Sequence, residues 1–201
     1  MLERDLIPVS RVAVAALVAR AARRVAPVIA TAVPVYGNEA WEWLNAIDAT
    51  IRTVDAFARA EPVSRFTLDL ASELSRAAAT ATAAAARGVG HSPLIEPLEL
   101  AYATAAFAAD AVRAATPERA AILGFQCCRA AEAAIPEMSR LIALDAATLP
   151  GLSDVRSVDP SDRGPLGELW PLGEPTGWAT TWEQFAIVAK QMPQLLALRE
   201  R

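Results

Sequence analysis

The run AAATATAAAA, residues 77–86, constrains the fold of this chain more than any other stretch. Alanine has the highest helix propensity and lets helices approach closely, whereas strands favour branched and aromatic side chains. We therefore expect a tightly packed helix that ends near Arg87, with Gly88 as a left-handed residue just after its end. The apolar face expected for this helix comprises Phe66, Leu70, Leu74, Ala77, Ala81 and Ala84.

Composition limits both the architecture and the class of partner. The 201 residues are 54% hydrophobic and 21% charged, which is enough for one good core. The formal net charge of −4 argues against a general nucleic-acid binder, because such proteins usually carry a basic excess on one face. We expect a single domain that binds no nucleic acid.

The first helix is expected to be basic and amphipathic. Residues 10–37 contain no acidic residue, and a valine and alanine stripe runs through them at helical spacing. The arginines Arg11, Arg20, Arg23 and Arg24 interrupt the apolar run, so neither a membrane span nor a standard signal peptide fits. The helix can lie on an anionic membrane or dock in its own bundle, with arginines in water or facing acidic residues later in the chain. We favour docking, because the stripe lacks the large side chains that usually drive insertion.

Turn and capping residues divide the first 148 residues into antiparallel helices. Breaks are expected at 34–38, 61–62, 88–97 and 116–117, where Pro, Gly, Asn and Thr occur. Thr116 is expected to cap the helix that starts at Pro117, and Pro136 to kink or divide that helix. The sequence thus predicts an all-α antiparallel bundle of about six helices.

The composition changes after residue 148. Residues 149–180 are rich in Pro, Gly, Asp and Ser but keep several Leu and Trp side chains, which disordered segments normally lack. We expect an ordered irregular arm across the bundle, followed by a last helix that begins near Thr180. Residues 1–148 would form the bundle and 149–201 would pack on it, giving a single domain overall.

The adjacent cysteines Cys127 and Cys128 cannot staple distant segments, and a disulfide between neighbours is strained. Helical neighbours point about 100° apart, so we expect one thiol in the core and the other at its edge. A zinc site would need more ligands than these and the one histidine, His91. A reducing cytoplasm fits this usage, and no cofactor is implied.

Two acidic pairs form the one catalytic constellation of interest. Glu39 and Glu42, and likewise Glu96 and Glu99, lie three residues apart, so four carboxylates on facing helices can meet a magnesium ion. This pattern resembles the all-α nucleotide pyrophosphohydrolases, which implies a magnesium-dependent hydrolase as the alternative function. Both pairs also lie in expected first helical turns, where the helix dipole favours acidic residues anyway.

A second resemblance is to the Ala-rich helical immunity-type proteins found beside bacterial polymorphic toxins. The segments RRVAP at 23–27, Trp41, FARAEP at 57–62 and the alanine run carry it. The tail VDPSDRGPLGELWPLGEPTGW, residues 158–178, resembles segments of uncharacterised bacterial proteins. The first resemblance implies a non-enzymatic protein that neutralises or recruits a protein partner.

From these observations we expect a cytoplasmic bacterial protein-protein interaction module of immunity or adaptor type, with no catalytic residue. Its partner is another protein, a membrane is not expected to be one, and homodimerisation stays open. Aromatic residues often anchor interfaces, and basic residues can flank them. The candidate partner-binding residues are Trp170, Trp178, Trp182, Arg20 and Arg24.

Overall fold

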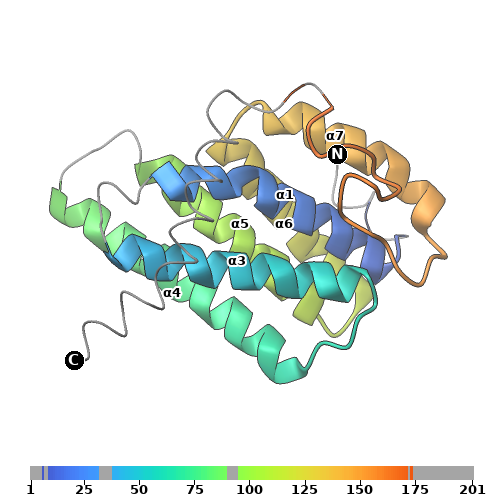
Figure 1. Ribbon diagram of the computed structural model, residues 1–201, viewed down its shortest axis with the longest axis horizontal. Helices are drawn as coiled ribbons and strands as arrows, with labels where there is room; N and C mark the ends of the chain where they lie inside the picture. The colour runs from blue at the N-terminus through green and yellow to red at the C-terminus, as the bar shows by residue number, and fades with distance from the viewer. Residues whose placement is uncertain (1–5, 7–8, 32–37, 90–94, 172, 174–201) are drawn as a thin grey trace.

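The computed structural model describes residues 6, 9–31, 38–89, 95–171 and 173, and it confirms the all-α bundle (Figure 1). Six helices and one short 3-10 helix make up its regular structure in that part of the chain. They are α1 (Arg11–Thr31), α3 (Asn38–Ala58), α4 (Arg65–Val89), α5 (Ile95–Arg113), α6 (Pro117–Ala134), α7 (Met138–Thr148) and η2 (Leu149–Leu152).

Helix α1 lies at the centre of the bundle. It packs against α3, α5 and α6, while α5 also packs against α4 and α6. Residues 13–22 of α1 are almost all apolar and all buried, so this helix is enclosed on every side. Small alanine side chains allow that close approach, and docking within the chain's own bundle is therefore the arrangement adopted. None of the described helices is long and apolar enough to cross a membrane.

Several expected boundaries are confirmed. Thr116 caps α6, its hydroxyl oxygen accepting a hydrogen bond from the backbone N–H of Arg119 at 3.2 Å. Pro136 divides the chain between α6 and α7, because the residue before it, Ile135, takes the extended conformation that proline imposes. The expected end of α4 is wrong: the helix continues to Val89, so Gly88 lies within its last turn.

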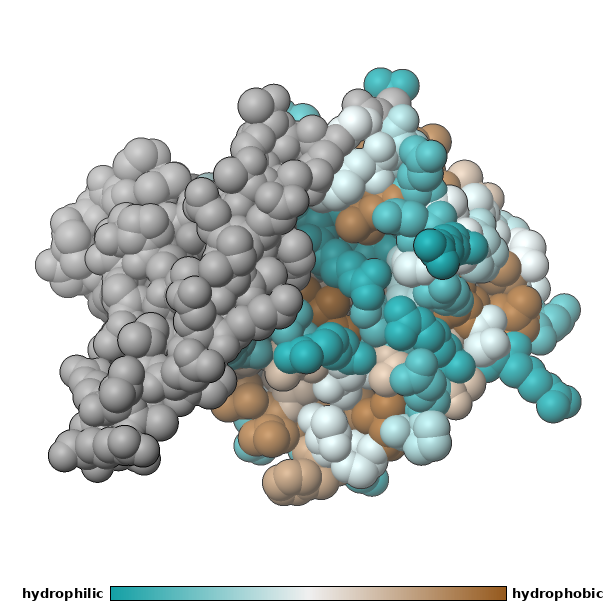
Figure 2. Space-filling view, viewed as in Figure 1, coloured by the Kyte–Doolittle hydropathy of each residue, from teal (hydrophilic) through white to brown (hydrophobic). Residues whose placement is uncertain are grey.

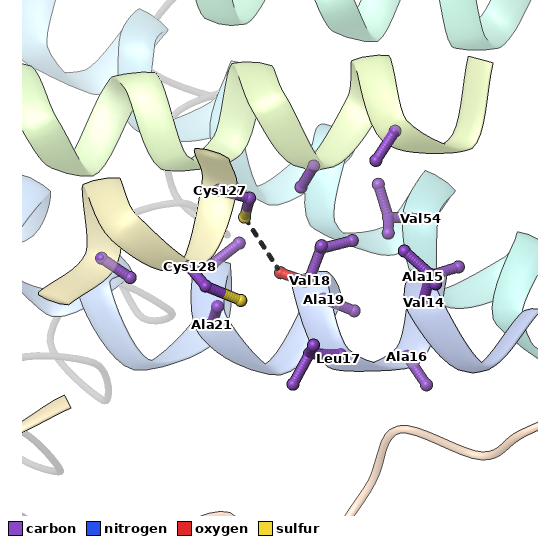
Figure 3. Packing of buried hydrophobic residues seen from close by; sticks show 14 of the residues in the cluster. Val14, Ala15, Ala16, Leu17, Val18, Ala19, Ala21, Val54, Cys127 and Cys128 are labelled. Atoms are coloured by element: carbon purple, nitrogen blue, oxygen red, sulfur yellow. Dashed lines mark hydrogen bonds between the residues drawn. The ribbon is translucent and has the colours of Figure 1, made fainter. Parts of the chain in front are cut away.

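The two cysteines are both buried, which corrects the expectation that one lies at the edge of the core. Figure 3 shows them on α6 beside α1, and the Cys127 thiol lies 3.3 Å from the Thr104 carbonyl oxygen of α5 and 3.9 Å from that of Val18. The thiols are enclosed because α1 and α5 both pack against α6. Burial raises the pKa of Cys127 and Cys128, so both remain protonated thiols.

Helix α4 shows Phe66, Leu70 and Leu74 of its expected apolar face to solvent, which is the largest difference from expectation, while the side chains of Ala81 and Ala84 lie outside the described residues. Among the α4 residues whose side chains the structure describes, the buried ones are Leu68, Ala71, Ser72 and Ser75. The serines enter the bundle because they have partners there: Ser75 shares a hydrogen bond with Thr50 of α3 at 2.9 Å, and Ser72 donates to Asp110 of α5 at 2.6 Å. The hydropathy pattern predicted that the face with Phe66, Leu70 and Leu74 enters the core. It could not show the hydrogen-bond partners of the serines, because Thr50 and Asp110 lie far from them in sequence.

The first part of the irregular arm packs on the bundle. Val158 and Leu166 are buried in the main core, and the Val158 N–H donates to the carbonyl oxygen of Ala58 at the end of α3 at 2.7 Å. The arm follows α7 and η2 and passes beside the N-terminal half of α1 (Figure 1). The expected last helix from Thr180, together with Trp178 and Trp182, lies outside the described residues.

Candidate functional site

Arg20 and Arg24 point into the molecule, one helical turn apart on α1. Both side chains are 0% exposed and share one carboxylate, that of Asp145 on α7. Arg20 Nε donates to Asp145 Oδ2 at 3.1 Å, and Arg24 donates to Oδ2 at 2.6 Å and to Oδ1 at 3.1 Å. The expectation that arginines of the first helix face later acidic residues is therefore confirmed for this pair.

The same two guanidinium groups hold the arm. Arg20 donates to the carbonyl oxygens of Pro160, Gly167 and Glu168, and Arg24 Nε donates to that of Leu169 at 2.9 Å. Two buried cations and one carboxylate leave an excess positive charge, which these carbonyl dipoles offset. Burial lowers the pKa of Arg24, and its hydrogen bond to Asp145 opposes that shift.

The structure places Arg20 and Arg24, which were predicted to bind a partner, inside the molecule. A side chain that is wholly buried and hydrogen-bonded inside its own chain presents no surface to another protein. The cluster of Arg20, Arg24 and Asp145, here called the arginine clamp, instead fixes the arm against α1 and α7. It is a structural site.

Trp170 is half-buried, and the clamp helps to place it. The guanidinium carbon of Arg24 lies 6.0 Å from the centre of its ring, within cation-π range. The ring also lines a pocket of about 370 Å³ between α1, α3 and the arm. Figure 2 shows hydrophilic side chains gathered on the face where these segments meet. Trp170 is thus a residue that joins the arm to the bundle, with part of its surface on a pocket wall.

The charges that line the pocket balance, and its other lining residues are Pro27, Ile51, Leu169 and Trp170. Its charged lining residues are Arg23, Asp48, Arg52 and Asp55. Arg23 forms an ion pair with the buried Asp55, and Arg52 pairs with Asp48 at 2.6 Å within α3. Desolvation by burial, followed by the nearby Arg59, lowers the pKa of Arg23. Each arginine is already paired, so the described lining residues offer neither a nucleophile with a base nor a net charge that would favour one class of ligand.

The four glutamates of the hydrolase alternative are not brought together by the described side chains. Glu39 lies in the first turn of α3 and Glu42 just after it, while Glu96 lies in the first turn of α5. The side-chain positions of all three are outside the described set. Glu99 is half-buried on α5. Among the residues that the structure describes, no group of three His, Cys, Asp or Glu residues could hold a metal ion.

The candidate interaction surface is the outer face of α4. Phe66 is 75% exposed, Leu70 42% and Leu74 39%, and they recur every four residues on one side of the helix. These three residues are called the α4 stripe below. Isolated exposed apolar side chains are ordinary, but a contiguous apolar surface marks an interaction site. Figure 2 shows hydrophobic residues at the lower edge of the molecule, along which α4 begins in Figure 1.

Two features border the α4 stripe. The exposed residues Glu73 and Arg76 follow one side of it, and the Arg76 guanidinium contacts the carboxylate of Asp110. Between α4 and α5 lies an open hollow of about 450 Å³, next to Arg76. Its other lining residues are Thr80, Ala103, Ala106, Phe107 and Asp110. The outer side of α4 therefore combines large apolar side chains, a charged edge and a shallow groove.

Sequence reasoning found the residues of the α4 stripe but placed them in the core. The signal that could have located them correctly is the second face of the same helix, where Leu68, Ala71 and Ser75 also recur at helical spacing. Small and hydroxyl-bearing residues suit a close helix-helix contact when partners are available. Which of the two faces is buried depends on the tertiary partners Thr50 and Asp110, whose positions the sequence alone does not give.

Comparison with known proteins adds no relative. No protein-family model, no curated protein and no solved structure matches this chain. The functional assignment therefore depends on the geometry and chemistry of the chain itself.

Proposed function

We propose that this chain is a non-enzymatic protein-protein interaction module that binds its partner through the α4 stripe. The observation that carries the proposal is the reversed orientation of α4, with serines toward the bundle and Phe66, Leu70 and Leu74 toward solvent. Exposing three large apolar side chains on one helix face is unfavourable in water unless a partner covers them. The arrangement favours recognition of an apolar helix, which contacts such a face through side chains at helical spacing.

The finer proposal is an immunity or adaptor protein of a bacterial toxin or defence system, acting in the cytoplasm. Its support is the resemblance of the alanine-rich helical segments to toxin-immunity proteins. An adaptor needs a rigid body that presents a docking surface. The buried arginine clamp and the closely packed α1 supply that rigidity, because they tie the arm, α1 and α7 together.

The experiment is a capture comparison with a matched control. The tagged wild-type chain, a Leu70→Glu variant and a Leu144→Glu variant are recovered from cells of the native host, and the bound proteins are identified and quantified. Leu144 is the control because it is 45% exposed on α7, away from the α4 stripe, and receives the same substitution. We expect a stoichiometric partner with wild type and Leu144→Glu, and its loss with Leu70→Glu.

Equal recovery of the same partner by all three chains would contradict the role of the α4 stripe. Circular dichroism of each variant should show that its fold is kept, since Leu70 is 42% and Leu144 45% exposed and both contribute little to the core. Turnover of a substrate by the purified wild-type chain would contradict the non-enzymatic assignment.

A further inference from the structure

We propose that the partner covering the α4 stripe is a second copy of this chain, with the two α4 helices paired antiparallel about a twofold axis near Leu74. This inference rests on the proposed function and names the occupant of the same surface. It follows from the order of large, small and charged residues along α4. A twofold contact uses the same surface patch on both copies, so the patch must complement itself.

The α4 stripe is uneven along its length. Its large side chains, Phe66, Leu70 and Leu74, occupy the N-terminal half of the helix, while Ala77 is exposed further along and the sequence continues in alanine. Parallel pairing would set Phe against Phe at one end and leave alanines apart at the other. Antiparallel pairing sets large residues of one copy against small residues of the other, which fills the interface evenly.

The register follows from the same sequence. If Leu74 lies beside the twofold axis, Leu70 of one copy lies near Ala77 of the other, because each is displaced from Leu74 by a similar number of residues in opposite directions.

The charged edge agrees with this register. Rotation about the twofold axis keeps the charged side of one α4 next to the charged side of the other, running in the opposite direction. Glu73 of each copy then lies near Arg76 of the other. Glu73 is exposed and has no ion pair among the described residues, while the Arg76 side chain is 63% exposed and retains N–H groups beyond its contact with Asp110. Opposite charges at the edge of a helix pair set its orientation.

Cysteine cross-linking tests the register directly. Single Cys substitutions at residues 66, 70, 74 and 77 are oxidised with copper phenanthroline, and the native Cys127 and Cys128 are buried and give little background. We expect Leu74→Cys to form a disulfide-linked dimer with itself. Leu70→Cys and Ala77→Cys should cross-link most when the two proteins are mixed, and Phe66→Cys should not cross-link with itself. Efficient self-linking of Phe66→Cys would indicate parallel pairing and overturn the arrangement.

The oligomeric state is measured on the full chain by light scattering at micromolar concentration. We expect a wild-type dimer, with Leu74→Glu weakening self-association by on the order of 100-fold because it removes a central contact and sets two carboxylates side by side. Leu144→Glu should remain a dimer. A monomeric wild type that binds another protein through the α4 stripe would overturn this inference and leave the proposed function standing. A monomeric wild type that binds nothing would remove both.

Discussion

Removing the charge of Asp145 is expected to cause a large loss of stability. Asp145→Asn keeps the shape of the side chain but leaves Arg20 and Arg24 as buried cations with only neutral acceptors. Three hydrogen bonds of 2.6–3.1 Å to the Asp145 side chain, which is 3% exposed, lose their negatively charged acceptor. Breaking a buried ion pair by removing one partner costs about 3–5 kcal/mol. That is a large share of the 5–15 kcal/mol by which a domain is typically stable.

Urea and thermal unfolding, followed by circular dichroism, measure this effect. For a chain of this length, about 3–5 kcal/mol corresponds to a decrease in Tm of roughly 6–20 °C. Arg129→Gln is the matched control, because Arg129 pairs with Glu132 on the surface and its side chain is 65% exposed. Surface pairs contribute about 0–1 kcal/mol, so the control should stay near wild type.

Proteolysis separates the effect on the arm from the effect on the bundle. Because Arg20 and Arg24 bind the carbonyl oxygens of residues 160 and 167–169, Asp145→Asn should also make the arm more susceptible to limited proteolysis. If Asp145→Asn unfolds within 1 kcal/mol of wild type, on the scale of a surface pair, the reasoning about the clamp is refuted.

Three further predictions concern the core and the arm. Gly124→Ala should not give the roughly 1 kcal/mol gain expected from helix propensity, and urea unfolding should show a net loss, because the added Cβ would lie 2.8 Å from Val14 Cγ1. A thiol reagent at mildly alkaline pH should modify neither Cys127 nor Cys128 in the folded chain and both after unfolding, since burial raises both pKa values; rapid native labelling would contradict their enclosure. The pKa of Asp159 is lowered from 3.8, chiefly by the hydrogen bond from the backbone N–H of Ser161. The ionised carboxylate therefore stabilises the arm above pH 3.8, and this stabilisation is lost as the pH falls through the pKa of Asp159 in the folded chain. When proteolysis of the arm is followed at decreasing pH, Asp159→Asn should remove this pH dependence.

The sequence predicted the fold class and most helix boundaries, because these depend on local chemistry. Thr116 with Pro117 starts a helix, Pro136 ends one, and alanine-rich segments with helical spacing have few alternatives. The burial of both cysteines was missed, because it depends on how closely α1 and α5 approach α6. That approach is a property of the assembled bundle.

The candidate site was harder to predict, for a physical reason. Residue type predicts that an arginine is exposed and a phenylalanine buried. Whether each is buried in the folded chain depends on partners that are distant in sequence. Asp145, 121 residues after Arg24, draws that arginine inside, and Thr50 together with Asp110 draws the serines of α4 inward. Phe66 and its neighbours consequently face outward. Trp170 was predicted to bind a partner protein; the structure places it where the arm meets the bundle, and its binding to a partner stays a prediction.

The most direct test of the central claim is the mass of the assembly formed by the wild-type chain, the Leu70→Glu variant and the Leu144→Glu variant after identical purification. A role of the α4 stripe in protein binding predicts that wild type and Leu144→Glu share one assembly of defined stoichiometry, with themselves or with another protein. Leu70→Glu should be recovered as a folded monomer. The same assembly in all three, or a folded monomer in all three, would contradict the claim that this surface exists to bind protein.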